Sequence, residues 1–142
     1  MGKQFSIRDV IMTGKPNIKG RILIVDDDKR VITMIARYLI KAGYDVESAT
    51  NGMEALELYR RSRERKPIDA IIVDLNLPDS IRGDEIMKHI IELDDSAIGI
   101  ISSGYHNDPV VQNYDQHGFS AVLKKPYPLK DLVKTIEKLL EK

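Results

Sequence analysis

The sequence has no cysteine among its 142 residues. This excludes a disulfide framework and any metal site built from thiolates, and it agrees with a reducing cytosol. An excess of charge of either sign is also lacking, because 22 Lys and Arg balance 22 Asp and Glu. A balanced chain generates no overall field that would attract nucleic acid or a membrane surface.

Long apolar runs are missing as well. No run approaches the roughly 18 residues that span a bilayer, and Met1–Ser6 lack the apolar stretch of a secretory signal. The basic residues between positions 60 and 66 fall at a predicted helix end, where a solvated face is the ordinary arrangement. We therefore expect a cytoplasmic chain with no membrane span and no direct contact to nucleic acid.

Five short apolar runs alternate with five segments of helical period. The runs are Arg21–Val25, Tyr44–Ala49, Ile68–Val73, Ala97–Ile101 and Ala121–Leu123, and the helical segments are Val31–Ala42, the segment opening at Asn51-Gly52, Asp84–Leu93, Asp108–His117 and Pro128–Leu140. This alternation predicts an α/β fold, a doubly wound parallel sheet with helices on both faces. Tyr44–Ala49 alternates more between polar and apolar residues, so we place it at an edge of the sheet.

Residues 1–20 stand outside this pattern. Phe5, Ile7, Val10 and Ile11 are spaced as in one short amphipathic helix, and Thr13–Asn17 has the composition of a linker. We assign residues 1–20 to an N-terminal extension or linker and residues 21–142 to the domain. The extension could be part of an upstream domain, an interaction arm or a disordered terminus.

Chemically active side chains follow four of the predicted strands. They are Asp26 and Asp27 after the first strand, Asp74 after the third, Ser103 after the fourth and Lys125 after the fifth. Ligands of open α/β sheets bind at the carboxyl ends of the strands, so the fold brings these groups to one edge. Each residue alone has an ordinary explanation as a turn or surface residue. Asp28 directly precedes a helical segment and is expected to cap it.

Carboxylates held close together repel one another and need a cation. Oxygen-only ligation selects a hard ion, and two or three carboxylates completed by water describe a Mg²⁺ site better than a caged Ca²⁺ site. Mn²⁺ could substitute for it. Lys125 adds one more positive charge, so the pocket with its bound ion would be close to neutral.

Three motifs stand out at the ends of the predicted strands: Ile22–Asp28, Ile71–Pro78 and Lys125–Tyr127, which read ILIVDDD, IIVDLNLP and KPY. Together they resemble the response-regulator receiver domain of two-component signalling systems. Each string alone is weak, but all three occur in order at suitable spacing, and the resemblance covers about residues 20–142. It implies a flavodoxin-like receiver fold with five strands in the order 2-1-3-4-5 and five helices.

The resemblance also implies roles for individual residues. Asp74 would accept the phosphoryl group. Asp27 and Asp74 would bind Mg²⁺ directly, Asn76 would contribute its backbone carbonyl, and Asp26 would act through a water molecule. Lys125 would pair with a phosphoryl oxygen, and its bond to Pro126 would be cis.

The hydroxyl that reaches the phosphoryl group would be Ser102 or Ser103. We choose Ser103, because it aligns with Lys125 without gaps and leaves Ser102 to end the fourth strand. The sequence departs from the family at Val122, where an aromatic residue often stands. Tyr105 could replace that aromatic residue in part, or could be a surface residue. The loop from Pro78 to Gly83 is one residue longer than usual, with Gly83 at the entrance to the third helix.

The implied function is a signalling switch that catalyses only its own phosphorylation and dephosphorylation. The donor would be a histidine kinase or a histidine phosphotransfer domain, and a downstream protein would bind the face made by the fourth helix, fifth strand and fifth helix. A homodimer is also open. The chain ends directly after its last helix, so we expect a stand-alone regulator or the receiver part of a hybrid histidine kinase.

Two other functions remain open at this stage. An aspartate-nucleophile phosphatase would use Asp26 as nucleophile and Asp28 as the second acid, although the chain is short for such an enzyme. A pseudo-receiver would serve only as a binding module, which the intact acidic set and lysine argue against.

Overall fold

The structure is a computed structural model that describes residues 18–78 and 81–141. Its strands are β1 (Gly20–Val25), β2 (Tyr44–Ala49), β3 (Ala70–Asp74), β4 (Gly99–Ser103) and β5 (Ala121–Lys124); its helices are α2 (Lys29–Lys41), α3 (Gly52–Ser62), α4 (Gly83–Leu93), α5 (Pro109–Gln112) and α6 (Leu129–Leu140), with a 3₁₀ helix η1 (Tyr114–His117). The short helix expected around Phe5–Ile11 lies outside the described residues.

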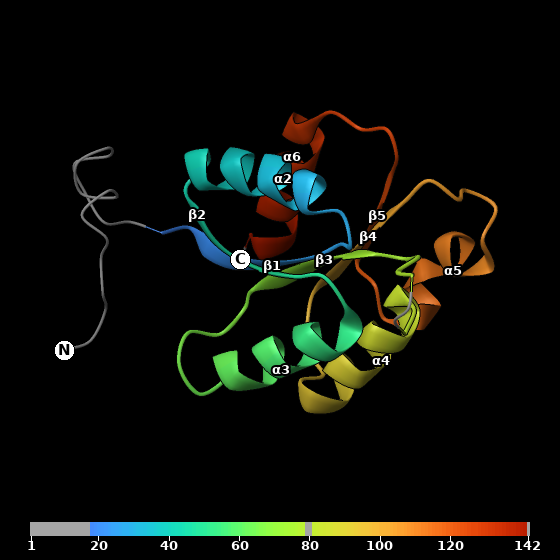
Figure 1. Ribbon diagram of the computed structural model, residues 1–142, viewed down its shortest axis with the longest axis horizontal. Helices are drawn as coiled ribbons and strands as arrows, with labels where there is room; N and C mark the ends of the chain where they lie inside the picture. The colour runs from blue at the N-terminus through green and yellow to red at the C-terminus, as the bar shows by residue number, and fades with distance from the viewer. Residues whose placement is uncertain (1–17, 79–80, 142) are drawn as a thin grey trace.

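All paired strands are parallel, and the sheet order is β2-β1-β3-β4-β5 (Figure 1). The fold class and the strand order implied by the resemblance are therefore confirmed. The alternating run Tyr44–Ala49 forms the edge strand β2, as its pattern predicts. The strands β1, β3 and β4 have neighbours on both sides, and their side chains are almost entirely buried, which explains their continuous apolar runs.

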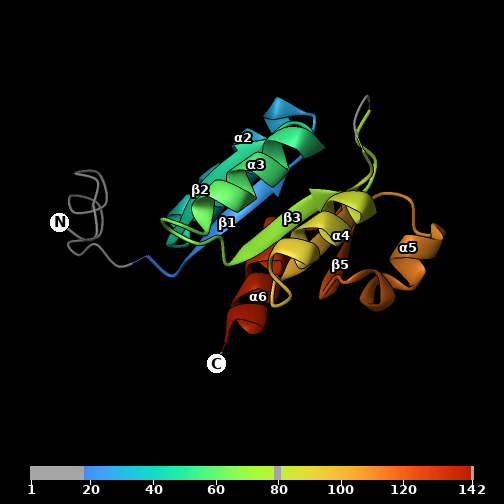
Figure 2. The same cartoon turned by 90° about the horizontal axis from the view of Figure 1, so that it is seen from below.

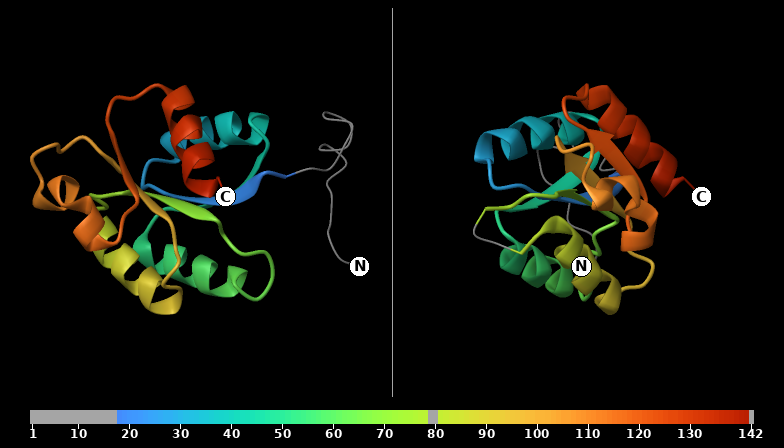
Figure 3. Two further views of the ribbon diagram at one scale, coloured as in Figure 1. Left: turned by 180° about the vertical axis from the view of Figure 1, so that it is seen from behind. Right: turned by 90° about the vertical axis from the view of Figure 1, so that its right-hand side faces the viewer.

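Helices cover both faces of the sheet. Helices α2 and α6 lie on one face, and α3 and α4 lie on the other (Figures 1 and 2). The edge-on view in Figure 3 shows the sheet as the central layer between them. Alternate residues of the central strands divide between two cores. Ile22, Ile24 and Ile72 pack toward α2 and α6, whereas Leu23 and Ile71 pack toward α3 and α4.

Two expectations about element ends are wrong. Asp108–His117 does not form one helix, because Asn113 leaves helical geometry at φ −120° and ψ 42° and separates α5 from η1. The carbonyl of Pro109 accepts the ordinary helical hydrogen bond from the backbone N–H of Asn113 and a second one from its side-chain amide. Ser102 does not end the fourth strand either, since pairing with β5 continues to Ser103.

The amino ends of two helices shape the carboxyl edge of the sheet. Asp28 caps α2 and accepts a hydrogen bond from the backbone N–H of Arg30, as expected. Helix α4 begins at Gly83, also as expected. A Cβ at Gly83 would lie 2.7 Å from the carbonyl oxygen of Asp74 and 2.8 Å from a methyl carbon of Val73. Glycine therefore allows α4 to start directly against the end of β3.

A different polar contact lies at the other end of the sheet, where the strands begin. Tyr59, near the end of α3, donates a hydrogen bond of 2.8 Å from its hydroxyl to Asp94, which follows α4. Burial, and then the hydrogen bond to this carboxylate, raise the pKa of Tyr59. This contact ties two helices together far from the strand ends that carry the acidic residues. Every helix within residues 18–78 and 81–141 is too short or too polar to cross a lipid bilayer.

Candidate functional site

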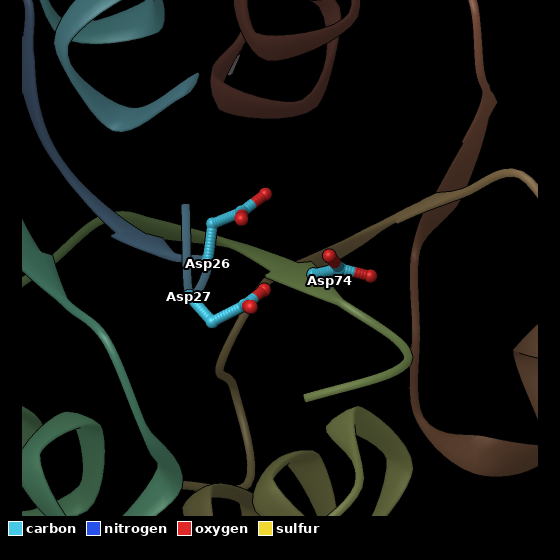
Figure 4. Close-up of side chains that lie close together, drawn as sticks. All are labelled: Asp26, Asp27 and Asp74. Atoms are coloured by element: carbon cyan, nitrogen blue, oxygen red, sulfur yellow. The ribbon is translucent and has the colours of Figure 1, made fainter. Parts of the chain in front are cut away.

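Three carboxyl groups meet where strands β1 and β3 end. One carboxylate oxygen each from Asp26, Asp27 and Asp74 lie within 4.8 Å of one another. Figure 4 shows that the first two side chains come from the turn after β1 and the third from the tip of β3. The two strands are neighbours in the sheet, so their parallel pairing is what brings the residues together. This is the arrangement expected from the sequence.

Lys125 reaches this cluster from the turn after β5. Its Nζ atom lies 3.5 Å from Oδ2 of Asp74 and 3.9 Å from Oδ2 of Asp26. The other oxygen of Asp74 accepts a hydrogen bond of 3.1 Å from the backbone N–H of Asn76. The turn after β3 therefore holds one oxygen of Asp74, while the second oxygen faces the ammonium group.

Burial differs among the three acids. Asp26 is 5% exposed, whereas Asp27 is exposed and Asp74 is half-buried. Burial raises the pKa of the Asp26 carboxyl, and the nearby carboxylate of Asp74 raises it further. The backbone N–H of Asp28, at 2.9 Å, and the ammonium group of Lys125 oppose that rise. The raised pKa therefore comes first from burial of the carboxyl and only second from the neighbouring negative charges.

The donor set fits Mg²⁺. Three carboxylates and one ammonium group leave two negative charges, which a divalent cation would balance. The grouped atoms are all oxygens, and one acid is solvent-exposed, so that water can complete an octahedral shell. The sequence predicted this hard-ion site, and the geometry of Asp26, Asp27 and Asp74 supports it.

Asn76 lies in the turn after β3, and Ser103 ends β4, the strand that pairs with β3. The side-chain nitrogen of Asn76 is buried and has no hydrogen-bond partner within the described part of the chain. Ser103, only 1% exposed, accepts a hydrogen bond of 3.0 Å at its hydroxyl from the backbone N–H of Tyr105. Its carbonyl accepts one of 2.8 Å from the backbone N–H of Lys125. Ser103, the hydroxyl residue chosen from the sequence, is therefore hydrogen-bonded to the backbone of Lys125.

The turn after β5 has the predicted cis bond between Lys125 and Pro126. It also carries a contact that the sequence analysis missed. The hydroxyl of Tyr127 lies 3.1 Å from the hydroxyl of Ser102, which is buried in β4. In the sequence, Tyr127 stands out only as the aromatic residue of a motif, and Ser102 only as an expected strand end. The signal that the sequence offers for this contact is the hydroxyl of Ser102, which stands next to Ser103 at the end of an otherwise apolar strand.

The structure also shows where the residues lie at which the sequence departs from the family. Val122 is partly buried against the core facing α3 and α4. Tyr105 is 64% exposed, and its described contact to the site runs through its backbone, so it is a surface residue here. In the longer loop, Arg82 forms ion pairs with Asp84 at 3.0 Å and with Asp108 at 3.2 Å. The second pair links the loop after β3 to the start of α5.

The fold and the site together define a class of protein. It is the class of doubly wound α/β domains with an acidic, lysine-bearing pocket at the carboxyl edge of a five-stranded parallel sheet. Comparison with known proteins identifies that class further.

Residues 22–137 match the family described as the response regulator receiver domain. The chemotaxis protein CheY of Thermotoga maritima is 32% identical over 120 residues, which are 84% of this chain and 96% of that protein. The transcriptional regulatory protein PrrA of Mycobacterium tuberculosis is 32% identical over 123 residues, 86% of this chain and 50% of PrrA. The chain thus spans about half of PrrA.

Among solved structures, a CheY-like response regulator receiver domain protein from Methanospirillum hungatei has a TM-score of 0.75 at 28% identity. The match covers 86% of this chain and 94% of that one. The chain belongs to the response regulator receiver domain family. Members of this family are switches of two-component signalling systems rather than classical enzymes, they bind Mg²⁺ at an acidic pocket, and they interact with histidine kinases and downstream effectors.

Proposed function

We propose that this domain accepts a phosphoryl group on Asp74 from a phosphohistidine of a histidine kinase or a histidine phosphotransfer domain, and that the modification switches its partner-binding surface. The observation that carries the proposal is the position of Asp74, with one oxygen 3.5 Å from the ammonium group of Lys125 and two further carboxylates beside it. A nucleophile, a fixed positive charge and an oxygen-ligand set thus share one strand edge.

The transfer would begin with attack of an Asp74 carboxylate oxygen on the phosphorus atom. The new O–P bond forms as the P–N bond of the phosphohistidine breaks, and the electron pair leaves with the imidazole nitrogen. The backbone N–H of Asn76 orients the carboxylate by holding its other oxygen. Lys125 would pair with a phosphoryl oxygen and offset its negative charge. The product is an acyl phosphate, which is reactive enough to be reversible.

The ion would be held by Asp27 and Asp74 directly, by the backbone carbonyl of Asn76, and by Asp26 through water. When bound, Mg²⁺ would supply positive charge that neutralises the phosphoryl oxygens during transfer. Mn²⁺, which takes a similar oxygen shell, would substitute. Because the pocket is balanced before transfer, the phosphoryl charge must recruit new partners in the protein.

The hydroxyl of Ser103 is the proposed new partner. It lies at the tip of β4, one residue before the loop that leads to α5, so its movement toward the phosphoryl group would draw this loop inward. The face made by α5 with η1, β5 and α6 would then change and bind a downstream protein or a second copy of the chain. Residues 21–142 form the proposed switch, with residues 1–20 as an extension and the cytoplasm as its location.

The test is incubation with acetyl phosphate and Mg²⁺, followed by intact-mass measurement and peptide mapping. We expect the mass of one phosphoryl group to be added, located on Asp74, with size measurement reporting any dimer. A generic phosphomonoester should be hydrolysed no faster than in buffer. Steady turnover of such an ester would instead favour the phosphatase alternative. Absence of both labelling and binding of beryllofluoride, which mimics an acyl phosphate, would favour a pseudo-receiver.

Replacing Ser103 by alanine should leave labelling of Asp74 intact and weaken the response to it. Loss of a hydrogen bond to a charged group should lower the affinity for beryllofluoride, an acyl-phosphate mimic, by about tenfold. The measurement is a beryllofluoride titration with Mg²⁺, followed by the amide chemical shifts of α5 and η1. The control is Ser62→Ala, which removes another buried serine hydroxyl, one that donates to the carbonyl of Tyr59. An unchanged titration for Ser103→Ala would remove this residue from the mechanism.

A further inference from the structure

A hydrogen bond between two side-chain hydroxyls joins the β5–α6 turn to the strand beside the proposed acceptor. The hydroxyl of Tyr127 lies 3.1 Å from that of Ser102. Ser102 is 3% exposed and pairs directly with Asp74 in the register of β3 and β4. The ring of Tyr127 packs against the core facing α2 and α6, which limits its movement.

The same turn carries Lys125, whose backbone is tied to β4 as well. Its N–H donates to the carbonyl of Ser103 at 2.8 Å, and its carbonyl lies 3.3 Å from Nε2 of His106. The bond from Tyr127 to Ser102 fixes the other end of the Lys125–Tyr127 turn to the same strand. The turn is therefore attached to the tip of β4 on both sides of Pro126.

This attachment bears on the position of the ammonium group. A lysine side chain has a flexible four-carbon stem, so its charge is placed accurately only if its backbone is held. The Lys125 ammonium lies 3.5 Å from Asp74, while its side chain remains 36% exposed. A partly exposed side chain has room to move away, so the anchoring of its turn decides how often it faces the acceptor.

We propose that Tyr127 is a positioning residue, whose hydroxyl bond to Ser102 holds the β5–α6 turn so that the Lys125 ammonium stays at the acceptor carboxylate. The proposal rests on the proposed function, in which Lys125 pairs with a phosphoryl oxygen. It assigns a specific task to the tyrosine hydroxyl, because a phenylalanine ring would fill the same space in the core without making the bond.

The test compares Tyr127→Phe with the unchanged protein in the rate of labelling by acetyl phosphate with Mg²⁺. Loss of one neutral hydrogen bond should slow labelling by about threefold to tenfold. Ser102→Ala removes the same bond from the other side and should give a similar loss, and combining the two should add little. Lys125→Met should slow labelling by roughly 100-fold, as for loss of one charged donor at a reacting oxygen.

A double-mutant cycle separates positioning from simple stabilisation of the fold. If Tyr127 acts through Lys125, then Tyr127→Phe should cause no further loss in the Lys125→Met protein. The matched control is Tyr59→Phe, which also removes a tyrosine hydroxyl bond, but at the opposite edge of the sheet. Denaturant unfolding is measured for every variant. Tyr59→Phe should lower the unfolding midpoint and leave the labelling rate unchanged.

Three results would overturn the proposal. The first is that Tyr127→Phe is labelled at the rate of the unchanged protein. The second is that Tyr127→Phe slows labelling equally with and without Lys125. The third is that Tyr59→Phe slows labelling as much as Tyr127→Phe does. In each case Lys125→Met alone shows whether the proposed role of Lys125 survives, while labelling of Asp74 in the unchanged protein tests the proposed function. If Lys125→Met labels normally, the role of Lys125 fails together with the inference; if it labels slowly, the inference alone fails.

Discussion

Replacing Asp74 by asparagine should abolish phosphorylation by acetyl phosphate. Asparagine has almost the same shape, so the turn after β3 and its hydrogen bond from Asn76 can remain, but an amide oxygen carries no negative charge to attack phosphorus. The change also removes one oxygen ligand of the proposed Mg²⁺ site. Loss of the nucleophile should slow labelling by at least about 100-fold. The measurement is the fraction of phosphorylated protein in intact-mass spectra over time.

The matched control is Asp69→Asn, directly before the first residue of the same strand. Asp69 is exposed and accepts a hydrogen bond from the backbone N–H of Arg21, so the charge change is the same but the site is untouched. This variant should be labelled at the normal rate. Label retained on Asp74→Asn would contradict the assignment of the acceptor. Label mapped to Asp26 would point to the phosphatase alternative.

Replacing Asp27 by asparagine should weaken metal binding and, with it, phosphorylation. One of three clustered carboxylates loses its charge, so attraction for a divalent cation falls while repulsion among the acids is also relieved. We expect Mg²⁺ or Mn²⁺ affinity to fall by roughly 10- to 100-fold, the range found for changes around metal ligands. Asp27 is the informative choice because it is exposed, so its replacement disturbs the core little.

Calorimetric titration with Mn²⁺ would measure the affinity, and the labelling rate would be followed at each metal concentration. Excess Mg²⁺ should restore part of the labelling of Asp27→Asn, and a chelator should stop labelling of the unchanged protein. The control is Asp28→Asn, which removes the same charge one residue away and retains a residue type that caps helices well. Equal affinities for Asp27→Asn and the unchanged protein would exclude Asp27 as a ligand.

Much of the fold could be predicted from the sequence, because the period of the apolar residues is a local property. Runs such as Ile22–Val25 and Ile71–Val73 are continuous since both faces of those strands are buried, and the edge strand alternates since it is more exposed. The element ends were less predictable. The segment of helical period is interrupted at Asn113, where the backbone leaves helical geometry, and an apolar pattern does not report such a change.

Some features of the site could likewise be predicted from the sequence, and others could not. Asp26, Asp27 and Asp74 could be placed together in advance, since parallel strands bring their carboxyl ends to one edge and the acids directly follow those strands. The bond from Tyr127 to Ser102 could not, because these residues are 25 positions apart and nothing in their spacing indicates contact. The ion pair of Arg82 with Asp108 joins residues 26 positions apart, and the sequence does not indicate it either.

The order of apolar runs, the capping residue Asp28 and the acids after the strands were determined by the sequence itself, since each depends on neighbours within a few residues. The tertiary structure alone decided which oxygen of Asp74 faces Lys125, which serine hydroxyl is bound to Tyr127, and that Tyr105 lies at the surface. These features depend on distances between side chains of different strands and loops. Such distances arise only when the packed sheet brings distant segments of the chain into contact.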